Sequence, residues 1–162
     1  MGKIGVALTL AGTAALLPGC YPEAVACPAI GHIAGVSLSV AASYADQVGT
    51  LRLKACQDGT CTEKDLDLHP GAVAVAVDQG CTPDGVCSAT SSPDGTFVGF
   101  LELPALSESP LEATVSGTSP SGTALPSRML TFTPKGDYPY GEQCGRVITA
   151  AVILDADGLK QG

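Results

Sequence analysis

The sequence predicts an all-β protein, an antiparallel β-sandwich of seven or eight strands with immunoglobulin-like architecture and three disulfides. Two observations lead to this class. Short apolar or alternating segments recur along the 162 residues, separated by Gly, Pro, Asp and Ser, and none keeps the period of a helix. Six cysteines follow residue 26, an even number that in an exported domain indicates three disulfides. The chain contains no Trp, so the likeness to immunoglobulins concerns architecture alone.

The expected strands follow from these segments in order. We place them at residues 35–42, 49–56, 61–68, 72–78, 96–103, 111–117, 127–133 and 146–154. In the first, Val36, Leu38 and Val40 share one face, as in a strand with one buried side. The last is apolar on both faces, which predicts a central strand, and its β-branched residues favour a strand over a short buried helix. Turns are expected at four Gly- and Pro-rich sites: 69–71, 93–95, 119–122 and 135–137.

The residues around Cys56 and Cys61 predict a hairpin whose register can be checked internally. An alternating segment ends at Cys56, residues 57–60 (Gln-Asp-Gly-Thr) supply a turn, and a return strand begins at Cys61. The register that joins the two cysteines also matches three other pairs: Lys54 with Glu63, Arg52 with Asp65, and Leu51 with Leu66. A shift of one residue would destroy all of these pairs together, so we predict a Cys56–Cys61 disulfide.

The other four cysteines are assigned with less independent support. The segment from Cys81 to Cys87 contains Pro-Asp-Gly and resembles a second small closed loop, which leaves Cys27 to pair with Cys144. Six cysteines allow 15 connectivities, and swapped pairings among the four middle cysteines are the main alternative. Zinc is a second alternative, which the spacing disfavours because the two close pairs are separated by four and five residues and do not match. We therefore predict no metal site.

The amino terminus predicts export and lipidation. Lys3 precedes an uncharged apolar run, residues 4–17, which as a helix reaches only about 21 Å and is too short for a hydrocarbon core of about 30 Å. Such a run is typical of a signal peptide. It ends in Leu17-Pro18-Gly19-Cys20, which resembles the lipobox of bacterial lipoproteins. In that family the cysteine receives a diacylglycerol and the peptide is cleaved just before it; Pro18 departs from the usual small residue.

The expected organisation has three parts: a signal peptide at 1–19, a lipidated tether at 20–26 and one β-sandwich domain at 27–162. Cleavage removes Lys3 and changes the formal net charge from −8 to −9. This charge disfavours nucleic acid and electrostatic attachment to an anionic bilayer. We therefore expect the membrane as a partner through the lipid on Cys20, with the protein on the outer face of the cytoplasmic membrane. A protein or cell-wall partner, which the sequence does not identify, is left open.

Three further segments carry a family resemblance: residues 26–31 (Ala-Cys-Pro-Ala-Ile-Gly), the Cys56–Cys61 hairpin, and Tyr138-Pro139 ahead of Gln143-Cys144-Gly145. Together they resemble a family of small, largely uncharacterised lipoproteins from high-GC Gram-positive bacteria. The resemblance implies an extracytoplasmic β-sandwich and little about activity. His32 stands where that family typically has Trp, so a packing aromatic is lost.

A search for chemistry finds little. There is no G-x-S-x-G, no glycine-rich phosphate loop and no basic patch, and the two histidines, His32 and His69, are expected at the surface. Asp65 and Asp67 are interpreted as part of a solvated, ion-paired face. The segment 155–158 begins like a calcium loop but lacks the later ligands, so a terminal turn is expected. We predict no catalytic residues and no cofactor.

The sequence therefore favours a non-enzymatic binding or scaffold module of the cell envelope. Loops carry function on such scaffolds, so contact surfaces are expected in 104–126 and 134–143. Tyr138 and Tyr140 are the candidate contact residues, with packing of their loop onto the sandwich as the alternative. A small cell-envelope hydrolase and a metal-binding lipoprotein are the alternative functions.

Overall fold

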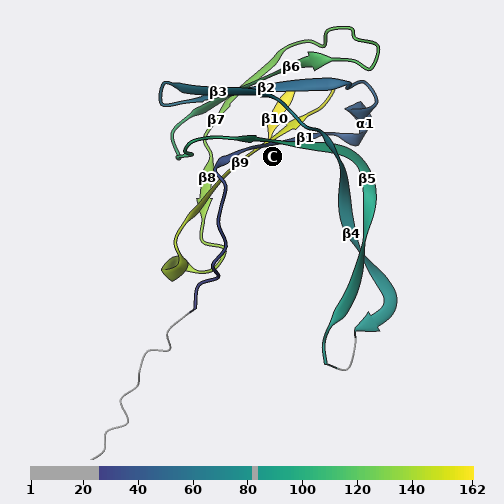
Figure 1. Cartoon of the computed structure of the whole chain (residues 1–162), viewed down its shortest axis with the longest axis vertical. Coiled ribbons are helices and arrows are strands. Elements are labelled where there is room, and N and C mark those ends of the chain that lie inside the picture. Colours follow the sequence, from purple (N-terminus) through teal and green to yellow (C-terminus); the bar gives the residue numbers. More distant parts are fainter. Residues whose placement is uncertain (1–25, 82–83) are drawn as a thin grey trace, which may run out of the picture.

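The computed structural model describes residues 26–81 and 84–162 and shows two β-sheets packed face to face (Figure 1). The predicted all-β sandwich is confirmed. The predicted signal peptide, the lipobox and Cys20 lie outside the described residues. None of the helices in the described part of the chain is long and apolar enough to cross a membrane.

The larger sheet has six strands, in the order β10-β9-β1-β5-β4, with β8 on a second stretch of β9. Its strands are β1 (Gly35–Val40), β4 (His69–Cys81), β5 (Cys87–Glu102), β8 (Lys135–Asp137), β9 (Val147–Leu154) and β10 (Leu159–Gln161). β1 and β9 run parallel, which departs from the antiparallel expectation. A parallel pair requires a long connection, and here almost the whole domain lies between the two strands.

The smaller sheet has the order β3-β2-β6-β7 and is antiparallel throughout. Its strands are β2 (Thr50–Gln57), β3 (Thr60–Asp65), β6 (Leu111–Thr118) and β7 (Arg128–Phe132). A one-turn helix, α1 (Ala42–Ala45), connects β1 to β2, and a short 3₁₀ turn, η1 (Glu142–Cys144), precedes β9. The sequence did not predict these two turns, β8 or β10, because segments of three or four residues carry too little periodicity to detect.

The core lies between the two sheets and is aliphatic. Val36, Leu38 and Val40 of β1 are completely buried, as their alternation predicted. They pack in one cluster with alternate residues of the other sheet, among them Leu53 of β2 and Val115 of β6. No polar or charged side chain of the described residues is buried in this core. The sandwich is therefore stabilised by hydrophobic burial between the sheets.

The longest strands, β4 and β5, form a hairpin that bends away from the sandwich and projects as a two-stranded arm (Figure 1). We call residues 72–81 and 84–93 the arm. The turn predicted at 135–137 is wrong, because the segment forms β8. The turns predicted at 69–71 and 93–95 are also wrong, because both segments lie inside strands. They face each other across the hairpin, where the register shifts between Pro70 and Ala72 and Gly95 has a φ of 80°. Two opposed turn sequences thus produce one bulged corner, from which the arm departs.

Candidate functional site

The outer face of the larger sheet exposes large apolar side chains. Leu101 of β5 and Val152 of β9 point into the core, so the strand alternation turns Val98, Phe100 and Ile153 outward. Ser39 of β1 lies between Val98 and Ile153 in the ladder. We call this surface the outer face. The predicted central position of the last strand is confirmed, but only one side of it is covered.

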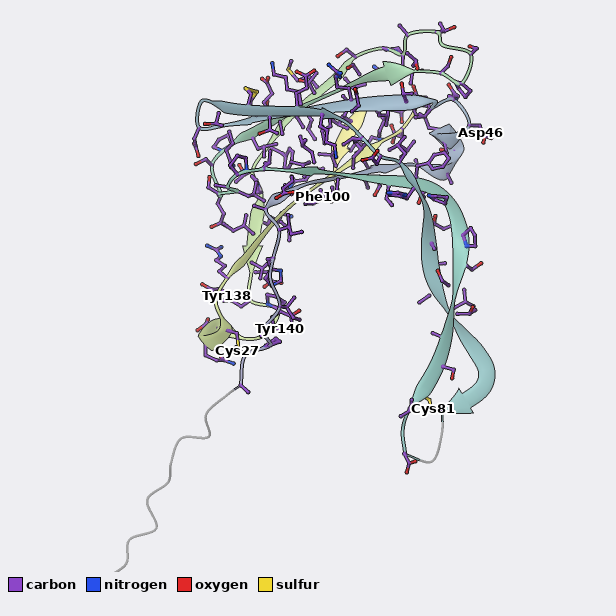
Figure 2. The ribbon with its side chains drawn as sticks, in the orientation of Figure 1. Cys27, Asp46, Cys81, Phe100, Tyr138 and Tyr140 are labelled. Atoms are coloured by element: carbon purple, nitrogen blue, oxygen red, sulfur yellow. A yellow bond between two sulfur atoms is a disulfide. The ribbon has the colours of Figure 1, made fainter. Side chains whose placement is uncertain are left out.

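Two projections flank the outer face. One is the arm, and the other, which we call the leg, consists of residues 26–34 and 135–146. Both extend from the same side of the larger sheet, with Cys27 and Cys81 labelled near their ends and Phe100 between them (Figure 2). Among the described residues, every exposed large apolar side chain except Met129 lies on the outer face, the arm or the leg: Ile30, Ile33, Val73, Val75, Val86, Val98, Phe100, Tyr138, Tyr140 and Ile153. The exposed apolar surface is therefore concentrated on one side of the molecule.

A disulfide and an ion pair hold the leg together. Cys27 is bonded to Cys144, which joins the start of the described chain to η1. Arg146 forms a two-pronged ion pair with Glu108, with 2.7 Å between Nη2 and Oε1. The Arg146 guanidinium also lies 5.8 Å from the centre of the Tyr138 ring. These contacts fix a loop that is otherwise remote from the core.

The two predicted contact residues lie on the leg and are exposed. Tyr138 and Tyr140 keep 42% and 40% of their surface accessible. Tyr140 lies 6.3 Å, ring centre to ring centre, from His32, which is exposed and precedes β1. Both tyrosines thus have a neighbour within the leg, Tyr138 at Arg146 and Tyr140 at His32.

The hairpin at Cys56 and Cys61 has the predicted register. Cys56 pairs with Cys61, Lys54 with Glu63 and Arg52 with Asp65 in the β2–β3 ladder, and Cys56 and Cys61 are disulfide-bonded. The Arg52 guanidinium binds both Asp65 oxygens, at 2.7 and 2.9 Å, and also reaches Glu63. Its hydrogen bonds hold the pKa of the Asp65 carboxyl below its ordinary value. This face is a solvated network of ion pairs, as the sequence indicated.

His69 shares an open pocket with two carboxylates and a hydroxyl, from Asp65, Asp67 and Thr50. The other polar groups of the pocket are engaged by partners of their own. Asp65 is bound by Arg52, Asp67 pairs with a lysine of β3, and the Thr50 hydroxyl bonds to a hydroxyl of β6 at 2.8 Å. His69 is the first residue of a strand and not the turn residue expected. Its side chain forms no hydrogen bond with a described residue. The pocket brings the groups together without the hydrogen bond between a base and a carboxylate that a triad needs.

The turn between β9 and β10 is closed by Asp155. Its carboxylate accepts hydrogen bonds from the backbone N–H groups of Asp157 and Gly158 and lies 2.6 Å from Lys160 Nζ. The ion pair with Lys160 and these N–H groups lower the pKa of Asp155 below its ordinary value. The segment is thus a terminal turn, as expected. In the described part of the chain no three His, Cys, Asp or Glu residues are grouped to hold a metal ion.

We expect Asp155→Asn to weaken the dependence of stability on acidic pH. Because the folded-state pKa of Asp155 is lowered, its contribution is complete above the ordinary carboxyl pKa of about 4 and is lost as the pH falls through the folded value. Between pH 7 and pH 3, urea unfolding should show a smaller loss of unfolding free energy for the variant than for the native protein. The difference between the two proteins should correspond to the uptake of less than about one proton. Asp46→Asn is the control, since Asp46 is exposed and forms no side-chain hydrogen bond with a described residue. An unchanged pH dependence in Asp155→Asn would contradict this assignment.

The remaining predicted site residues are cysteines. The structure bonds Cys81 to Cys87 at the end of the arm, so that the three disulfides have the pairing that the sequence favoured. Cys20 lies outside the described residues. Sequence reasoning missed the outer face, because it expected the last strand to be covered on both sides and assigned contacts to loops. The sequence did contain a signal for this face, because the apolar residues Val98 and Phe100 of β5 alternate with residues that point into the core.

Comparison with known proteins identifies no relative. No family model matches the chain, no curated protein matches it, and no solved structure matches it. The resemblance to small lipoproteins of high-GC Gram-positive bacteria and the immunoglobulin-like description therefore stay predictions.

Proposed function

We propose that this protein is a lipid-anchored, extracytoplasmic β-sandwich that acts as a non-enzymatic binding or scaffold module at the outer face of the cytoplasmic membrane. The observation that carries the binding role is the apolar outer face, where Phe100 keeps 43% of its surface exposed between two projections. Exposed apolar side chains gathered on one side of a domain are typical of a contact surface. The acidic formal charge, −8, supports a partner other than nucleic acid.

Three disulfides support the location. All six cysteines from Cys27 to Cys144 are paired, and the pairs on the leg and the arm lie where a cytosolic reductant would reach them. Disulfides of this kind persist in oxidising compartments. The apolar run before Cys20 and its lipobox-like sequence supply the route of export and the anchor.

Metabolic labelling with an alkyne fatty acid in a lipoprotein-processing bacterium tests the anchor. We expect the full-length chain to acquire the label and to fractionate with membranes, and Cys20→Ser to lose both properties. Intact mass after alkylation without reduction gives a second readout, in which the mature protein carries diacylglycerol and no alkylated thiol. An unlabelled, soluble wild-type protein would overturn the proposed anchor.

Site-specific photo-crosslinking tests the binding role. A photoreactive amino acid at Ile153, on the outer face, is expected to form a defined adduct in intact cells. The same amino acid at Met129 is the matched control, because Met129 is exposed on β7 of the opposite sheet. No adduct at Ile153, or equal adducts at both positions, would contradict a binding role for the outer face.

A second candidate function is a small cell-envelope hydrolase, favoured by the pocket that brings His69 beside Asp65, Asp67 and Thr50. The engagement of both aspartates by cations counts against it. Hydrolysis of a chromogenic ester by the purified full-length protein, and its loss in His69→Ala, would favour this candidate over the binding module. Activity that His69→Ala retains would remove it.

A further inference from the structure

The leg presents apolar and aromatic side chains to solvent along its length. Ile30 and Ile33 are 54% and 68% exposed, and Tyr138 and Tyr140 stand on the adjoining segment. The Cys27–Cys144 disulfide joins the two segments, and the rings of Tyr140 and His32 lie 6.3 Å apart across them, so the segments form one support for these side chains. Figure 2 shows Cys27, Tyr138 and Tyr140 together at this part of the molecule, away from the sandwich.

The length of the tether places the anchor close to this surface. Six residue steps separate Cys20 from Ala26, where the described chain begins at the leg. A fully extended chain of that length reaches only about 21 Å. Under the lipid anchoring proposed above, on which this inference rests, the leg is therefore the part of the sandwich domain that the tether holds beside the bilayer.

The charge of the leg also fits a lipid surface. Its two segments contain two basic residues, Lys135 and Arg146, and two acidic residues, Asp137 and Glu142, so their formal charges cancel. The whole chain, in contrast, has a net charge of −8. Glu108, which lies outside the leg, pairs with Arg146. The negative charge that would repel a membrane is thus mainly on other parts of the molecule.

We propose that the leg rests on the membrane, with Tyr138, Tyr140 and Ile30 at the interface between the lipid headgroups and the acyl chains. Tyrosine is enriched at membrane interfaces because its ring is apolar and its hydroxyl is polar. Transfer of an isoleucine side chain from water to the lipid surface is also favourable. The anchor then fixes an orientation, in which the arm and the outer face also point toward the bilayer.

The absence of Trp provides a direct test. Tyr138→Trp and Ile30→Trp each introduce a unique fluorophore on the leg, and Met129→Trp places one on β7 of the opposite sheet. The lipidated full-length protein is incorporated into phosphatidylcholine vesicles with or without bromine atoms high on the acyl chains. We expect brominated lipid to lower the emission of both leg variants roughly twofold, because interfacial rings lie at the headgroup level, and to leave Met129→Trp unchanged.

Three results would overturn the proposal, and they can be told apart. Vesicle-bound protein without quenching in either leg variant would retain the anchor and exclude contact of the leg with lipid. If the emission of the leg variants is already blue-shifted before vesicles are added, and brominated lipid does not change it, the leg associates with a second copy of the protein. Failure to float with vesicles, together with a mass that lacks lipid at Cys20, would overturn the anchor and with it the orientation. Far-ultraviolet circular dichroism confirms that each variant is folded, and the second leg position covers a folding failure of the first.

Discussion

Replacing Cys27 and Cys144 together by serine is expected to lower the free energy of unfolding by about 4–5 kcal/mol. This disulfide spans 117 residues, and it restricts the unfolded chain more than any other bond in the described structure. It also ties residues 26–34 to η1, so its loss should release these residues from the domain. Urea unfolding of the double variant, followed by far-ultraviolet circular dichroism, measures the effect.

The disulfide between Cys56 and Cys61 provides the matched comparison. It spans only five residues, within a hairpin that backbone hydrogen bonds and ion pairs already hold. The same chain-entropy model gives about 2 kcal/mol for so short a loop. The two double variants should therefore differ by about 2–3 kcal/mol. Equal losses would show that loop length does not govern the stabilisation in this protein.

Replacing Leu38 by alanine is expected to lower the free energy of unfolding by about 3–4 kcal/mol. Leu38 is completely buried in β1, which pairs with β5 on one side and β9 on the other. A cavity there would be enclosed by both sheets, and the ladders on each side limit how far the strand can move to fill it. For a domain of this size, a decrease of roughly 10 °C in the thermal midpoint is the corresponding readout.

Met129→Ala is the control for this prediction. Met129 is 63% exposed on β7, so its truncation removes few contacts and should change stability by less than about 0.5 kcal/mol. A small effect of Leu38→Ala would mean that the core can collapse around the missing side chain. It would contradict the packing described between the two sheets.

A function at one side of the molecule would explain why the sandwich is built asymmetrically. The smaller sheet exposes charged side chains, such as those that pair with Arg52, whereas the larger sheet exposes Val98, Phe100 and Ile153. A single sandwich core supports both sheets, so the difference is not required for folding. The apolar outer face and the leg are the surfaces that the proposed experiments address.

Local features of the sequence were sufficient to predict some elements. The Cys56–Cys61 hairpin follows from its turn, its charge pairs and its apolar pair, which all lie within sixteen residues and agree on one register. The buried face of β1 follows from simple alternation at Val36, Leu38 and Val40. One detail differs: Glu63 is opposite Lys54 in the ladder, but its carboxylate binds Arg52. Side chains can choose among neighbours on the same face, which a register does not determine.

The arm shows where local reasoning fails. Residues 69–71 and 93–95 each have the composition of a turn, and each was placed between strands. In the structure they oppose one another in a continuous hairpin, and Gly71 accommodates the side chains of Thr96 and Asp94. Asp94 accepts hydrogen bonds from the Thr96 backbone and hydroxyl, which completes the corner. Whether such a segment reverses the chain or only bends it depends on its partner strand.

The all-β class, the faces of the alternating strands and the hairpin register could be predicted from the sequence, because each depends on residues that are close in the chain. Three other properties follow from the packing of distant segments: the parallel pairing of β1 with β9, the corner that directs the arm, and the exposure of Val98, Phe100 and Ile153, which no described segment covers. These depend on which distant segments meet. Periodicity shows that a face is apolar, but the packing of the whole chain decides whether another layer covers it.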